Sequence, residues 1–120
     1  MKPSERDISS LRHIVKHCEE IVEAVEKHSL TLDIVSSDNL YKNALAMSVL
    51  QIGELANVLS EDFRKTHNTM PWREIKRMRD KAAHHYWTFD VKILWETIIE
   101  DIKPLKDYCL ECINKYDSKR

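Results

Sequence analysis

The sequence predicts an all-α fold, an antiparallel up-and-down bundle of four helices, or of five if one helix breaks. Two observations predict it. The chain has a single glycine and three prolines, so it lacks the glycine-rich tight turns that β-hairpins use. Apolar residues recur every three or four positions over long segments, which places them on one side of a helix. At 120 residues, the chain is expected to form one domain, residues 1–120, with one hydrophobic core.

The first two predicted helices cover the N-terminal half of the chain. One runs from about residue 4 to 28, and residues 29–37 break its pattern and are expected to form a connector. The next, from about 38 to 66, has an apolar surface wider than one stripe, which predicts a central helix contacted on two sides. Gly53 lies in its middle, where a glycine costs about 1 kcal/mol relative to alanine. Its presence there indicates that another backbone approaches closely.

The other two predicted helices follow a proline signal. Pro71 suits the first turn of a helix, because its missing N–H is not needed there. This third helix loses its regularity around residues 87–89. The fourth begins near Asp90, a suitable N-cap, and Pro104 is expected to kink or restart it. Short connections between long amphipathic helices imply antiparallel packing.

Charge and cysteine content limit the function and the compartment. The net charge is −1, which argues against a general electrostatic grip on nucleic acid, so any contact with RNA must be focal. No apolar run approaches the ~20 residues of a membrane helix, and no secretory signal is visible, so we expect a cytoplasmic protein without a membrane partner. The cysteines, Cys18, Cys109 and Cys112, are odd in number and are expected to be small core residues with no metal role.

The segment from Arg77 to Trp87 is the densest in chemistry. It holds three cations, one carboxylate, two imidazoles and a phenol. A guanidinium can clamp phosphate oxygens with two parallel hydrogen bonds and stabilise the charge of a transition state. An imidazole titrates near neutral pH and can move protons. In RNA the attacking group can be the substrate's own 2′-hydroxyl, so this set is suited to phosphodiester cleavage without a metal.

Helix geometry restricts how these groups meet. Arg79 and His84 are five residues apart, which separates them by roughly 140° around an ideal helix, whereas Arg79 and Tyr86 are nearly in line. Either the helix unwinds near His84, or a second subunit brings its own copy of the segment. We expect both, and above all a two-fold dimer, because two copies of each residue then line one cleft. The alternative is that these are ordinary surface residues with no catalytic role.

The spacing Arg79-x4-His84-x-Tyr86 resembles the Rx4HxY signature of the HEPN family. The resemblance is specifically to the HepT-like toxins that are paired with MNT-type nucleotidyltransferase antitoxins. It covers roughly residues 40–110 and extends to the flanking segments Gln51–Glu54, Pro71–Ile75 and Tyr86–Asp90, and then to Trp95 and the region of Pro104.

The resemblance implies a homodimeric helical bundle with its motif in a cleft at the dimer interface. Arg79 and His84 would carry metal-independent cleavage of RNA, either tRNA or mRNA, with no cofactor. Tyr86 would be the residue that the antitoxin modifies with AMP. The added bulk and negative charge beside Arg79 would then block RNA. Asp80 departs from the asparagine often found after the motif arginine. As a carboxylate it could pair with Arg79, in a supporting role, and weaken the pull of Arg79 on phosphate.

Two other functions stay open on sequence alone. One is a non-catalytic helical module that binds a nucleotide or a protein, such as a nucleotidyltransferase. Asp80 and the near-neutral charge fit that reading. The other is a metal site built from His84, His85 and a carboxylate such as Glu54. The sequence argues against this site, because no Glu-x-x-His pair occurs on two helices. His85 receives no other role.

Overall fold

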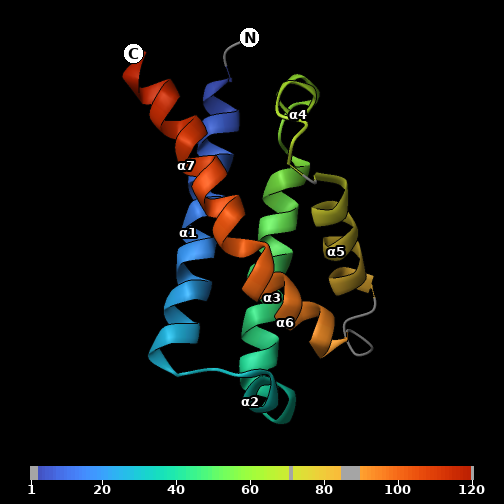
Figure 1. Ribbon diagram of the computed structural model, residues 1–120. Coiled ribbons are helices and arrows are strands. Elements are labelled where there is room, and N and C mark those ends of the chain that lie inside the picture. The colour runs from blue at the N-terminus through green and yellow to red at the C-terminus, as the bar shows by residue number, and fades with distance from the viewer. Residues whose placement is uncertain (1–2, 71, 85–89, 120) are drawn as a thin grey trace.

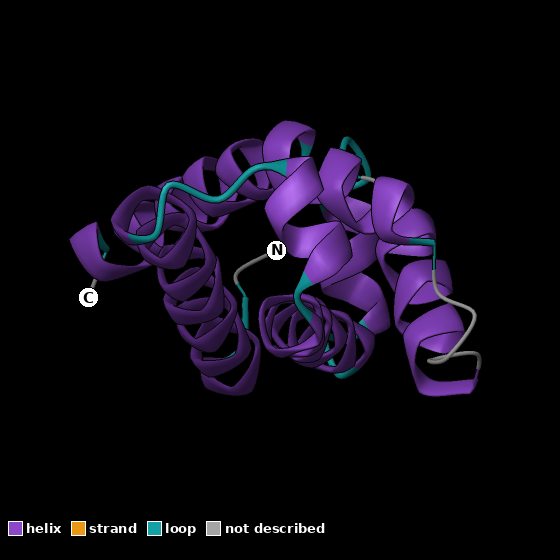
Figure 2. Cartoon of the chain, turned by 90° about the horizontal axis from the view of Figure 1, so that it is seen from below, coloured by secondary structure: helices purple, strands orange, loops and turns teal. Residues whose placement is uncertain are grey.

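The computed structural model consists of helices joined by loops (Figure 2). It describes residues 3–70, 72–84 and 90–119, with the backbone alone at 74, 78 and 81–84. Within these ranges there is no strand, which confirms the all-α prediction. No helix in them offers the apolar length that crossing a bilayer requires. The helices are α1 (Glu5–Lys27), α2 (Leu32–Ser37), α3 (Asn39–Asn57), α4 (Glu61–Thr66), α5 (Trp72–His84), α6 (Val91–Glu100) and α7 (Ile102–Ser118).

Helix α3 occupies the centre of the bundle. It packs against α1 on one side and α5 on the other, while α7 packs on α1, and α6 contacts α7, α2 and α3. Figure 1 shows α1 and α7 on one flank and α5 on the opposite flank, with both chain termini at the same end. The wide apolar surface of the second predicted helix is thus explained, because α3 does have helical neighbours on two sides.

The helix boundaries subdivide three of the predicted segments. The expected connector contains the short helix α2, whose N-cap Thr31 accepts a hydrogen bond from the N–H of Ile34. The second predicted helix is broken between α3 and α4, where the Ser60 hydroxyl caps α4. The last one divides at Asp101 into α6 and α7. Pro104 then lies in the first turn of α7, where its missing N–H costs no helical hydrogen bond.

The hydrophobic core is built mainly between α1, α3 and α7. All three cysteines belong to it as free thiols, which confirms their predicted place in the core. Burial raises the pKa of Cys18 to about 12 and also raises the pKa of Cys109 and of Cys112, so the thiols stay protonated and unreactive. The largest fully buried side chains are Leu11, Ile14, Cys18, Ile21, Val35, Leu59, Leu94 and Cys109.

Part of the apolar surface that the sequence assigns to the core is exposed in the single chain. On α3, Leu40 is 81% exposed and Met47 is 51% exposed, and Val58, just beyond its end, is also exposed. Ile99 on α6 is exposed as well. Leu40 and Met47 are seven residues apart, so they share one stripe of α3. We call the outward face of α3 that holds Leu40 and Met47 and continues to Val58 the α3 stripe.

A buried carboxylate joins the start of α1 to the start of α4. Asp7 accepts hydrogen bonds from the backbone N–H of Ser60 (2.8 Å) and from its hydroxyl (2.7 Å). The same hydroxyl accepts a bond from the N–H of Phe63 (3.1 Å), so Asp7 fixes the residue that caps α4. Burial raises the pKa of Asp7, but the hydrogen bonds with Ser60 and Ser4 lower it by more, and the pKa is lowered overall.

We expect Asp7→Asn to lower the free energy of unfolding by about 1–3 kcal/mol at pH 7, because it leaves buried hydrogen-bonding groups of Ser60 poorly matched. Since the pKa of Asp7 is lower in the folded state, its ionised form stabilises the protein above the unfolded pKa of about 3.9. That stabilisation is lost as the pH falls through the folded pKa. Urea unfolding of the wild type and of Asp7→Asn at a series of pH values should therefore show that the difference between their free energies of unfolding shrinks below pH ~4. A difference independent of pH would contradict this role.

Candidate functional site

Helix α5 carries the site, and its N-terminal end is anchored to the core. Trp72, its first residue, is buried, and its indole Nε1–H donates a hydrogen bond to the carbonyl of His67 (3.0 Å). The Trp72 ring also lies against Phe63 of α4, with ring centroids 6.1 Å apart. These contacts fix where α5 begins and therefore how its later turns lie along α3.

Gly53 is the point of closest approach between α3 and α5. A Cβ atom built on Gly53 would lie 2.2 Å from the Cβ of Arg79 and 3.3 Å from its Cα. Such distances leave no room for any side chain, so only glycine permits this helix crossing. The close approach predicted from the mid-helix glycine is confirmed, and the residue that makes it is Arg79.

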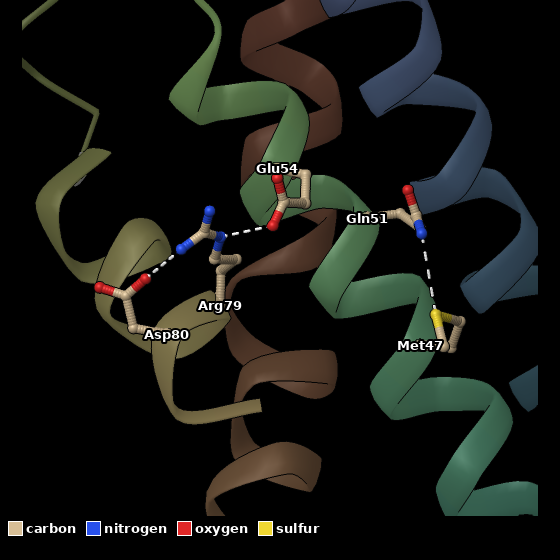
Figure 3. A network of polar contacts seen from close by, with 5 residues as sticks. All are labelled: Met47, Gln51, Glu54, Arg79 and Asp80. Carbon is tan, nitrogen blue, oxygen red and sulfur yellow. Dashed lines mark hydrogen bonds and ion pairs between the residues drawn. The ribbon is translucent and has the colours of Figure 1, made fainter. Parts of the chain in front are cut away.

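The guanidinium of Arg79 is held by two carboxylates (Figure 3). Its Nε–H donates to Oε1 of Glu54 on α3 at 2.6 Å, and its Nη1 donates to Oδ1 of Asp80 at 2.5 Å. The hydrogen bond to Glu54 and then the one to Asp80 raise the pKa of Arg79 above its usual value. The side chain is 22% exposed, so the cation is fixed in orientation but still reaches solvent.

This arrangement leaves Arg79 able to bind an anion. A guanidinium has five N–H donors, and the contacts to Glu54 and Asp80 use two of them. The pairing between Asp80 and Arg79 that the sequence raised as a possibility is present. Because hydrogen bonds to ionised groups are strong and directional, the two carboxylates act as orienting contacts as well as counter-charges.

The outer face of α5 adds positive charge near this cation. Arg73, Lys76 and Arg77 are exposed, at spacings that place them along one side of the helix. None of the three belongs to an ion pair among the described side chains. We call these three residues the α5 basic face. The near-zero charge of the whole chain therefore conceals a local concentration of positive charge on the helix that carries Arg79.

The structure describes the side chains of some predicted site residues and not of others. Arg79 and Asp80 are together, as described above. His84 is the last residue of α5, and the helix is continuous from Arg79 to it, so the chain does not unwind before His84. Positions 79 and 84 thus stay roughly 140° apart around the helix axis. The imidazole of His84 and the whole of His85 and Tyr86 lie outside the described part of the structure.

Glu54 has a role that the sequence did not reveal. In the sequence it is a possible metal ligand and part of the Gln51–Glu54 segment of the resemblance, whereas in the structure its carboxylate is engaged with Arg79. Residues 84 and 85, the other members of that hypothetical site, fall outside the described side chains. The signal that could have found the contact is local, because Glu54 directly follows the one residue, Gly53, that indicates a close helix crossing.

These features define a class of protein, a helical bundle in which one helix carries an oriented arginine and, on its outer face, three exposed cations. A family model described as Ribonuclease HepT-like matches residues 7–112. The chain belongs to this HepT-like ribonuclease family, which confirms the resemblance seen in the sequence.

Curated relatives cover most of the chain. A protein of Caldanaerobacter subterraneus subsp. tengcongensis, provisionally named RNase TTE0752, is 34% identical over 105 residues, which is 88% of this chain and 92% of the relative. One of Thermococcus cleftensis, provisionally named ribonuclease HepT, is 39% identical over 95 residues, or 75% and 86% of the two chains. No solved structure matches this chain significantly.

Proposed function

We propose that this chain is a metal-independent endoribonuclease toxin whose site uses Arg79 to bind phosphate and His84 to move protons. The observation that carries the proposal is the guanidinium of Arg79, oriented by Glu54 and Asp80 yet still open to solvent. Membership of the HepT-like ribonuclease family and the provisional RNase names of its relatives support the same activity.

The chemistry follows from the groups involved. Arg79 holds the oxygens of the scissile phosphate and stabilises the negative charge that develops in the transition state. His84 transfers protons, which an imidazole does well near neutral pH. The 2′-hydroxyl of RNA is the nucleophile, so the substrate must be RNA and the protein needs neither a nucleophile of its own nor a cofactor. The Asp80 carboxylate supports the orientation of Arg79.

The α5 basic face supports RNA as the substrate class. Lysine and arginine side chains in a line bind successive phosphates of a nucleic-acid backbone. Arg73, Lys76 and Arg77 are exposed within two turns of Arg79, so they hold a bound strand on the helix that carries the proposed reactive position. This is the focal contact that the low net charge of the chain requires.

We also propose that the active form is a homodimer. Leu40 and Met47 stay exposed in the single chain, and an apolar stripe of this kind is typical of an interface. Glu54 is seven residues beyond Met47, so the α3 stripe runs to the residue that holds Arg79. A two-fold pairing across this stripe brings a second copy of the site alongside, which allows Arg79 of one protomer to act with His84 of the other.

The proposed regulation acts at Tyr86. An MNT-type nucleotidyltransferase antitoxin in the same cytoplasm attaches AMP to the Tyr86 phenol. The new phosphate is negatively charged and bulky, and it competes with RNA for Arg79. This proposal rests on the motif Arg79-x4-His84-x-Tyr86, in which the tyrosine follows the proposed proton-transfer residue by two positions.

Incubation of the purified chain with end-labelled tRNA and mRNA in excess chelator tests the activity. We expect defined cleavage products with 2′,3′-cyclic phosphate ends, since these form when the 2′-hydroxyl attacks the neighbouring phosphate. Binding of both RNAs without any cleavage would contradict the proposal. It would favour the non-catalytic binding module, a reading that the two carboxylates on Arg79 also fit.

A further inference from the structure

Unlike Arg12–Asp117, the other ion pair that joins two helices in the described part of the chain, the contact between Glu54 and Arg79 is not made through an outer nitrogen of the guanidinium. It joins two helices, α3 and α5, across 25 residues of sequence, and it uses the inner nitrogen of the guanidinium, Nε. A hydrogen bond at Nε fixes the plane of the guanidinium. As Figure 3 shows, it also leaves the outer nitrogens directed away from the Glu54 carboxylate.

Two consecutive residues of α3 constrain the two ends of this side chain. Gly53 lies against the Cα and Cβ atoms of Arg79, which fixes where the side chain leaves α5. Glu54 holds Nε, which fixes where the side chain ends. Because both its Cβ and its guanidinium are held, the Arg79 side chain keeps one orientation before any substrate binds. Electrostatic catalysis requires pre-organisation of this kind.

We propose that Glu54 is a positioning residue for Arg79, presenting the outer edge of the guanidinium to the RNA phosphate. This inference rests on the proposed ribonuclease function and adds a residue to it. The alternative role for Glu54 is that of a competitor, which occupies Arg79 and keeps phosphate away from it. The two effects differ in sign, because removing a competitor speeds RNA cleavage, whereas removing a positioning contact slows it.

The test compares Glu54→Ala with Glu54→Gln at saturating RNA. We expect Glu54→Ala to lower the turnover about 10- to 100-fold, since a small misplacement of a catalytic group has effects of this size. Glu54→Gln should lose less, because its amide oxygen still accepts the Nε–H, although a neutral bond is weaker. The matched control is Glu111→Ala, which removes an exposed ion pair with Lys115 (3.3 Å) on α7 and should leave the turnover unchanged.

A double-mutant cycle separates positioning from a general effect on folding. Arg79→Lys keeps the positive charge but has no Nε–H for Glu54 to hold. In that background, adding Glu54→Ala should cause little further loss of turnover. An equal loss in both backgrounds would assign Glu54 a merely structural role and overturn the inference.

Two outcomes distinguish this inference from the proposed function. If the wild-type chain cleaves RNA and Glu54→Ala cleaves it equally fast or faster, Glu54 is not a positioning residue, while the ribonuclease function stands. If the wild-type chain cleaves no RNA, the proposed function fails. The NMR signal of the Arg79 Nε–H then tests whether Glu54 holds the Arg79 side chain in one orientation. We expect that signal to exchange slowly with water in the wild-type protein and rapidly in Glu54→Ala. Equal exchange in both would overturn the inference.

Discussion

Replacing Arg79 with alanine is expected to lower the rate of RNA cleavage about 100- to 1,000-fold at saturating substrate, the usual effect of removing one transition-state charge contact. The loss should lie in the turnover more than in the KM, because the guanidinium acts most strongly when negative charge develops on the phosphate. Arg79→Lys should recover only part of the rate, since an ammonium group cannot form two parallel bonds to phosphate.

Arg77→Ala is the matched control for this experiment. Arg77 is on the same helix two residues away, but it is exposed and belongs to the α5 basic face. Its loss should weaken RNA binding and reduce the dependence of binding on salt, with little change in the saturated rate. Equal effects of the two substitutions on the saturated rate would mean that Arg79 contributes only general positive charge, and the proposed site would be wrong.

Gly53→Ala is expected to lower the free energy of unfolding by about 1–3 kcal/mol, although alanine is normally the better helix residue by about 1 kcal/mol. Alanine destabilises the protein at this position because the new Cβ would lie 2.2 Å from the Cβ of Arg79 and 2.9 Å from its Cγ. Helix α5 must then move away from α3, and Arg79 moves with it. RNA cleavage should fall together with stability.

Urea unfolding measures this effect, with Asn43→Ala as the control on the same helix. Asn43 is exposed, so alanine there changes helix propensity without any close contact and should leave stability unchanged or slightly raised. If Gly53→Ala were as stable as Asn43→Ala and equally active as the wild type, the close crossing of α3 and α5 would not hold the site together.

The parts of the fold that periodicity encodes could be predicted from the sequence. The apolar spacing along α1 marks its buried side, and the position of Gly53 indicates a helix crossing, because both signals are local. The break before α4 is not visible in the sequence pattern, because a single capping side chain decides where that helix begins. Ser60 begins α4 with the help of Asp7, which is 53 residues away. No local pattern contains that contact.

The site was predictable to a similar extent. A motif identifies Arg79 and Asp80 as candidates, and the sequence permits their pairing. The contact between Arg79 and Glu54 depends on how α3 and α5 cross, and that crossing is a tertiary property. The exposure of Leu40 and Met47 was also hidden, because an apolar residue on a wide stripe has the same spacing whether its own chain or a second copy covers it.

The most direct test of the central claim mixes Arg79→Ala chains with His84→Ala chains. Each variant alone should be inactive. If two protomers build each site, random mixing should restore about a quarter of the wild-type activity, because half of the dimers are mixed and each of these holds one complete site. Native mass spectrometry would establish that mixed dimers form. Mixed dimers with no more activity than either variant alone would contradict a site shared between two copies of this chain.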